Sequence, residues 1–142
     1  MRLAVGLGLV LLGLGGWWFF RAPAAPPPEL IAGLADEGFS GAPCPARTIL
    51  EQDARKKRGP QAPTAFAQRL RARFALGSPG EALKKTLFDQ GFAPISPCAN
   101  DEGVFGARWR GKNWGDPDAY VYWRVDPEEK LVFVDGHVSR TP

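Results

Sequence analysis

The feature that most constrains this chain is an uncharged apolar run near its N-terminus. Residues 3–20 contain no charged side chain, and the run closes with Trp17-Trp18-Phe19-Phe20 before Arg21. At about 1.5 Å per residue, a helix of this length just spans the hydrocarbon core of a bilayer. Aromatic rings followed directly by an arginine are typical of the membrane interface. We therefore expect residues 1–21 to form a signal anchor, that is, a single transmembrane helix.

A cleaved signal peptide is the alternative, because Ala22-Pro23-Ala24 has small residues at the two positions that a processing site requires. The long apolar run and the crowding of prolines at that site favour the uncleaved anchor. Arg2 and the free N-terminus lie on one side of the apolar run and Arg21 on the other, so the difference in positive charge that sets the orientation is small. We expect a single-pass protein of a bacterial inner membrane with its C-terminal domain in the periplasm; a secreted or soluble periplasmic protein is the alternative.

Two cysteines, Cys44 and Cys98, agree with export, because disulfides persist in oxidising compartments. A bond between them closes a loop of about fifty residues and joins the segment before the expected helices to the loop after them. The two thiols are too far apart in sequence, and too poorly supported by other ligands, for a zinc site. The single histidine, His137, does not change this, so no metal or cofactor is expected.

The rest of the chain has room for one compact domain of roughly 100 residues. Residues 22–28 read APAAPPP and predict an extended, proline-rich tether. Residues 29–63 predict a short, basic, helical lead-in, with one helix over 29–39 and a second, exposed one over about 46–57. Residues 64–142 are expected to be the compact domain.

The lead-in carries a basic patch, the run Arg55, Lys56, Lys57 and Arg58. Such a patch suits anionic lipid headgroups or nucleic acid, but a solvated helix face is the simpler interpretation of a charge run. No aromatic residue interleaves with it to stack on bases, so nucleic acid is not the expected partner. Residues 22–142 carry 16 basic and 15 acidic side chains, so net charge does not identify a partner either.

Two helices are predicted at the start of the compact domain. Thr64 is the expected N-cap of a helix whose apolar residues recur every four positions, at Phe66, Leu70 and Phe74, before an end near Gly77. The sequence Ser78-Pro79-Gly80-Glu81 then predicts a capping box. The second helix has its apolar face at Leu83, Leu87 and Phe88, and it stops at Gly91. The short connection predicts an αα-hairpin.

From Val104 onward the apolar pattern changes from helical to alternating. Strands are predicted over about 105–110, 120–125 and 131–134, with a turn at 126–129 between the last two. These three strands form an antiparallel β-meander whose apolar face needs cover, and the helix pair is its expected cover. The fold class is therefore α+β, with an αα-hairpin on a three-stranded sheet.

Catalytic constellations are weak in this sequence. His137 lies near Asp135 and Ser139, but a surface histidine close to a turn explains it more simply than a triad. Asp116 and Asp118 lack the further oxygen ligands of a calcium loop, and turn chemistry accounts for them. We therefore expect a protein that is not an enzyme.

A concentration of aromatic and basic residues on the strands is the strongest candidate interaction surface. Because neighbours along a strand alternate faces, Tyr120 and Tyr122 cannot point the same way as Trp123, so some aromatic surface is expected to be exposed. An aromatic-rich small core is the competing interpretation. The candidate residues are Arg108, Arg110, Trp114, Tyr120, Tyr122 and Arg124.

The segment from Phe74 to Leu83, the pair Gly91-Phe92 and the later meander with Leu131-Val132-Phe133-Val134 resemble the SmpA/BamE-like domain over about residues 64–138. In that family two helices pack on a three-stranded antiparallel sheet, and known members are small bacterial envelope lipoproteins that assist outer-membrane β-barrel assembly. β-Lactamase inhibitory proteins share this layout. The present chain lacks the lipid-attachment cysteine of the assembly lipoproteins.

These features lead to one expected function and two alternatives. The expected function is a non-enzymatic, membrane-anchored interaction domain that binds another envelope protein through its sheet face or strand connections. The first alternative is a cleaved, exported binding or inhibitor protein. The second, remote alternative is an enzyme that uses His137. The sequence does not identify a small-molecule ligand.

Overall fold

The computed structural model of the chain describes residues 26–37, 43–59, 61–112 and 115–140. The expected anchor over residues 1–21, most of the tether and Trp114 lie outside the described residues. Within the described part, no helix has both the length and the apolar character needed to cross a bilayer.

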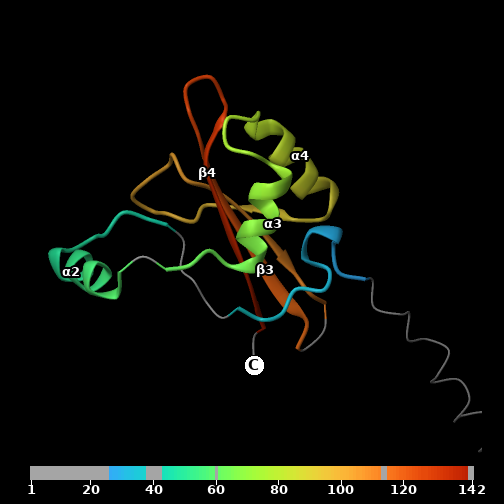
Figure 1. Cartoon of the computed structure of the whole chain (residues 1–142), viewed down its shortest axis with the longest axis horizontal. Coiled ribbons are helices and arrows are strands. Elements are labelled where there is room, and N and C mark those ends of the chain that lie inside the picture. Colours follow the sequence, from blue (N-terminus) through green and yellow to red (C-terminus); the bar gives the residue numbers. More distant parts are fainter. Residues whose placement is uncertain (1–25, 38–42, 60, 113–114, 141–142) are drawn as a thin grey trace, which may run out of the picture.

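The described residues form an α+β fold in which helices lie against one antiparallel sheet (Figure 1). The sheet has four strands in the order β1-β2-β3-β4. The three strands predicted from the alternating pattern are present, and the sheet has one strand more than expected. The additional strand, β1, has only three residues and contains a proline, so it carries no alternation that a sequence pattern can reveal. The strands are Ala93–Ile95 (β1), Phe105–Arg110 (β2), Pro117–Val125 (β3) and Leu131–Arg140 (β4).

Three α-helices precede the sheet: α2 (Ile49–Arg58), α3 (Ala65–Arg73) and α4 (Gly80–Asp89). The predicted cap of α3 is confirmed, because the Thr64 hydroxyl oxygen accepts a hydrogen bond from the Ala67 backbone N–H. The predicted helix over 29–39 is wrong. Over the described residues 29–37, the helical part is the 3-10 turn η1 (Glu29–Ile31), and the Glu37 backbone N–H donates to Val138 of β4.

The predicted capping box before α4 is also wrong. Pro79 occupies the N-cap position without a side-chain cap, and the Ser78 hydroxyl donates to the Ala75 carbonyl behind it. The start of α4 is held by the β3–β4 hairpin, because the Gly80 N–H donates to the Glu129 carbonyl. A Cβ atom at Gly80 would come within 2.5 Å of a Val125 methyl carbon, so the close approach of helix and hairpin requires glycine here.

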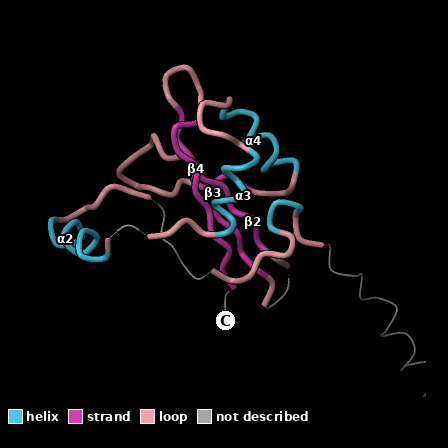
Figure 2. The backbone as a smooth tube through the Cα atoms, viewed as in Figure 1, coloured by secondary structure: helices cyan, strands magenta, loops and turns pink. Residues whose placement is uncertain are grey.

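Helices α3 and α4 cover one face of the sheet, so the expected two-layer arrangement is present (Figure 2). Helix α3 lies against β4, and α4 runs from the β3–β4 hairpin toward Trp109 of β2. The main core between the layers is formed by side chains from η1, α3, α4 and the helix-covered face of the sheet. Its largest fully buried members are Leu30, Phe66, Leu70, Leu83, Leu87, Leu131, Val121, Val134 and Val138.

The contact between α3 and β4 is close, and it also covers the edge of the sheet. Three outward-facing carbonyls of β4, on residues 134, 136 and 138, accept hydrogen bonds from the Arg71 guanidinium, the Thr64 hydroxyl and the Glu37 backbone N–H. An edge whose carbonyls are satisfied in this way offers little to a further strand. The β4 edge is therefore closed along half its length.

Substitution of Gly136 tests this contact. A Cβ atom there would lie 2.8 Å from a Leu70 methyl carbon and 2.9 Å from the Tyr120 carbonyl oxygen. The Tyr120 carbonyl oxygen belongs to the backbone of β3 and cannot shift without disturbing the sheet. Gly136→Ala is therefore expected to lower the free energy of unfolding by about 1–3 kcal/mol in urea denaturation. Val132→Thr on the same strand, at a half-exposed site, is the control and should change it by less than about 0.5 kcal/mol. Equal effects of the two substitutions would contradict this packing.

The opposite face of the sheet has a second, smaller core under the segment that carries the disulfide. Cys44 and Cys98 form a disulfide with their Cα atoms 5.3 Å apart, which confirms the predicted pairing. Cys98 and Val104 pack on Tyr122, with Cys44, Ile95, Tyr120 and Phe133 around them. The disulfide therefore fastens a cover onto the sheet face that the helices leave open.

Removal of the disulfide should destabilise the domain strongly. The two cysteines are 54 residues apart, and closing a loop of that size in the unfolded chain corresponds to about 4 kcal/mol. We expect Cys44→Ala/Cys98→Ala to lose about this much in equilibrium urea denaturation. Reductant should produce a similar loss in the parent protein and none in the double variant. A parent protein indifferent to reductant would show that the bond does not hold the fold.

Candidate functional site

The predicted aromatic and basic surface lies on the sheet face opposite the helices. Register places Arg108, Arg110, Tyr120, Tyr122 and Arg124 together on that face, and Trp123 on the helix-covered face, as the alternation predicted. Tyr122 is only 5% exposed, however, and burial raises its pKa to about 12. Tyr122 therefore belongs to the second core and is not available as interaction surface.

The basic residues of this face are largely engaged within the domain. Arg108 forms an ion pair with the buried carboxylate of Asp118 and lies over the Tyr120 ring, 5.1 Å from its centroid. Arg124 pairs with Asp101 in the covering loop, and this hydrogen bond lowers the pKa of Asp101. Among the described members of the predicted surface, Arg110 is the one that stays exposed.

His137 is not the surface residue that its position suggested. Strand β4 continues to Arg140, well beyond the predicted end at residue 134, so His137 lies inside the strand opposite Tyr120. The imidazole is fully buried and stacks on the Tyr120 ring with centroids 4.9 Å apart. Asp135 and Ser139 lie on the same strand face, but a side chain with no exposed surface cannot meet a substrate. His137 is therefore part of the second core.

Stability should depend on pH through His137. Burial lowers its pKa below 6.5, and the carboxylates of Asp135 and Glu37 offset part of this shift. The unfolded chain then binds more protons than the folded one, so this contribution is complete above about pH 6.5 and is lost as the pH falls toward the folded-state pKa. We expect the unfolding free energy to fall between about pH 7.5 and 5.5, before carboxylates titrate. The variant His137→Phe keeps an aromatic ring but has no titrating group, so it should lack this pH dependence. If the slope of the unfolding free energy against pH is unchanged in the variant, His137 is not its source.

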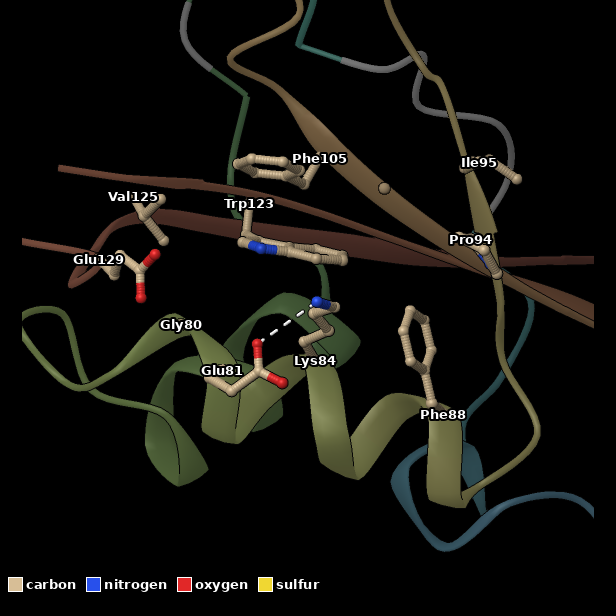
Figure 3. A pocket seen from close by; sticks show the side chains of 11 residues that line it. Gly80, Glu81, Lys84, Phe88, Pro94, Ile95, Phe105, Trp123, Val125 and Glu129 are labelled. Atoms are coloured by element: carbon tan, nitrogen blue, oxygen red, sulfur yellow. Dashed lines mark ion pairs between the residues drawn. The ribbon is translucent and has the colours of Figure 1, made fainter. Parts of the chain in front are cut away.

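A groove lies between α4 and the sheet on the helix-covered side of the described domain (Figure 3). It has a volume of about 240 Å³ and lies where α4 leaves the corner formed by β1, β2 and the β3–β4 hairpin uncovered. Its floor and walls are predominantly apolar. The lining residues are Gly80, Glu81, Lys84, Phe88, Pro94, Ile95, Phe105, Gly106, Trp123, Val125 and Glu129.

Three aromatic side chains define the groove. Phe105 stacks on Trp123 with ring centroids 5.9 Å apart, and Phe88 faces these rings from α4 (Figure 3). Phe105 is 45% exposed and Phe88 38% exposed, whereas Trp123 is buried at 5%. The groove therefore presents two partly exposed aromatic rings beside a buried one.

Charged groups line the groove at the helix and the hairpin. On α4, Lys84 and Glu81 form an ion pair of 3.4 Å, and Glu129 lies on the hairpin side (Figure 3). Both members of the pair are about half exposed or more, so the pair contributes little to stability. Charged groups at the rim orient a partner, while the apolar floor supplies the contact area. The described residues contain no group of three histidine, cysteine, aspartate or glutamate side chains that could hold a metal ion.

The sequence pattern did not reveal this groove, because its residues come from four separate segments: α4, β1, β2, and β3 with the hairpin that follows it. Phe88 was expected on the buried face of its helix with Leu83 and Leu87, yet only the two leucines are fully buried. Phe88 lies one residue beyond that stripe, which turns its ring toward the sheet corner. The usable signal is the pairing of two aromatic residues on one face of adjacent strands, Phe105 and Trp123.

Comparisons with known proteins gave no family model, no curated protein and no solved structure that matches this chain.

Proposed function

We propose that this protein is a non-enzymatic interaction domain of the bacterial envelope, tethered to the inner membrane by its N-terminal segment and facing the periplasm. Its binding site is the groove between α4 and the sheet, and its partner is another envelope protein that inserts an apolar side chain there. The observation that carries the proposal is the partial exposure of Phe88 and Phe105 beside the buried ring of Trp123. Exposed aromatic rings at the mouth of an apolar pocket are typical of protein-binding sites.

The size of the groove favours a side-chain anchor over a whole small molecule. Pockets for drug-sized ligands usually have volumes of roughly 300–1,000 Å³, and this groove has about 240 Å³. Full burial of one large apolar side chain contributes roughly 1.5–3 kcal/mol, so a single anchor is a strong but insufficient contact. The surrounding rim then supplies the rest of the interface.

Strand addition is a less suitable mode of binding. The Gly111 N–H donates to Pro117 of β3, and the alternation along β2 then directs the N–H groups of Arg108 and Gly106 toward β1. Pro94, opposite Ala107, therefore turns its backbone outward, where it has no N–H to donate. With β1 limited to three residues and half of the β4 edge closed by Arg71, Thr64 and Glu37, a partner gains more from the groove than from either sheet edge.

Two further features support an extracytoplasmic location. The Cys44–Cys98 disulfide fastens the second core, and such bonds persist in oxidising compartments. The apolar run of residues 3–20 supports an anchor. The resemblance to SmpA/BamE-like domains agrees with an envelope role, although the described sheet has a fourth strand.

Site-specific photo-crosslinking in the native host tests this proposal. A photoreactive residue at Lys84, on the rim of the groove, should capture one defined envelope protein, and the same residue at Val132, on β4, should not. The captured protein is then purified, and its affinity for the full chain is measured. Phe105→Ser should weaken the affinity by at least about tenfold, because it removes an aromatic wall of the groove. Val132→Ser is the matched control, since Val132 is 51% exposed and not part of the groove.

The outcomes separate the proposal from its alternatives. Equal capture at both positions, or equal affinity of the two variants, would contradict the groove as the binding site. Mass spectrometry of the recovered chain tests the tether: an intact N-terminus supports the anchored protein. A product that begins near Ala25 would instead support the cleaved, exported binding or inhibitor protein.

A further inference from the structure

Helix α2 forms in an unusual setting, because none of its ten residues is buried. Isolated helices of fewer than about 12–15 residues are marginal in water, and most helices in proteins are stabilised by packing of an apolar face. Figures 1 and 2 show α2 at one end of the molecule, away from the sheet and the other helices. Packing within the described domain therefore does not account for this helix.

Polar contacts fix one side of α2 against the segment that carries the disulfide. Arg55 forms an ion pair with Glu51 and also donates to the Cys44 carbonyl. The Arg47 N–H donates to the Glu51 carboxylate over 2.9 Å, and Thr48 caps the helix. These contacts determine which side of α2 faces the domain, and therefore which side faces away.

The side that faces away combines apolar and basic residues. At about 100° per residue, Ile49, Leu50, Lys56 and Lys57 lie opposite Glu51 and Arg55. Ile49 is 77% exposed and Leu50 82% exposed, the highest values among the large apolar side chains that the structure describes as exposed. Asp53 lies at the centre of this outward face and offsets one of the two lysine charges, while Arg58 lies nearer the side of Glu51 and Arg55.

From this arrangement we infer that the outward face of α2 binds the surface of an anionic phospholipid bilayer. Ile49 and Leu50 enter the boundary between headgroups and acyl chains, and Lys56 and Lys57 contact lipid phosphates. A short helix with exposed apolar residues beside lysines is the form in which proteins lie on membrane surfaces, since lysine stems extend toward the headgroups. The inference concerns a surface distant from the groove and does not depend on the proposed function.

Charge complementarity favours a bilayer over nucleic acid. The outward face pairs its lysines with two aliphatic side chains, which lipid can bury and which a phosphate backbone cannot. No aromatic ring lies on α2 to stack on bases. Each basic residue near an anionic membrane surface contributes about 1 kcal/mol, or roughly fivefold in binding.

Hydrogen exchange of the full chain in lipid nanodiscs tests this inference. In one arm, nanodiscs of phosphatidylcholine alone are compared with nanodiscs containing phosphatidylglycerol. In a second arm, the chain stays in phosphatidylcholine nanodiscs, and vesicles with or without phosphatidylglycerol are added. Exchange at residues 49–58 should slow severalfold with the anionic lipid in the nanodisc or in the vesicles, and high salt should reverse the effect. Lys56→Glu/Lys57→Glu and Ile49→Ser/Leu50→Ser should each abolish it, while exchange in β3 stays unchanged and shows that both variants are folded.

A control variant with the same change in net charge separates the local effect from a general one. Lys85→Glu/Lys130→Glu alters two exposed lysines outside α2 and outside the groove, and it should keep the slowed exchange. If phosphatidylglycerol changes the exchange at residues 49–58 neither in the nanodiscs nor in the vesicles, the inference is overturned. Slowing by a single-stranded oligonucleotide but not by lipid would also overturn it and would assign the patch to nucleic acid.

Discussion

The structure depends on the burial of strand β3 on both of its faces. Val121 and Trp123 contribute to the core under the helices, and the alternate residue Tyr122 contributes to the core on the other side. A strand that is buried on both faces needs chain segments packed on each face, and the two short helices pack on one face only. The second cover is the loop held by Cys44–Cys98, so we expect this sheet to depend on the disulfide.

The groove follows from the way the first cover is distributed. Helix α3 packs on β4 at Gly136, and α4 begins on the β3–β4 hairpin and runs toward Trp109 of β2. Two short helices placed in this way leave the corner beside β1, β2 and the hairpin partly uncovered. The rings of Phe105 and Phe88 are consequently left partly exposed beside Trp123, and this exposed corner is the site that we assign to a partner.

The sequence predicted those helices and strands that are determined by interactions between residues close together in the chain. Thr64 fixed the start of α3, since a capping hydroxyl acts within one turn, and the alternation after Val104 identified β2, β3 and β4. Strand β1 and the length of β4 were missed. A three-residue strand has no periodicity of its own, and the sequence Asp135-Gly136-His137 interrupts the apolar pattern that a strand usually shows.

The sequence by itself determined the α+β class and the alternate faces of Tyr122 and Trp123, because composition and side-chain period are properties of the chain. It favoured a bond between its two cysteines, and the structure brings them together. Tertiary structure alone decided that Tyr122 and His137 are buried, that Arg108 and Arg124 are paired within the domain, and that the open site lies on the helix side. The physical reason is that exposure depends on which distant segment covers a face. In this protein the covering segments are a loop and two helices, and their positions on the sheet cannot be read from any local sequence pattern.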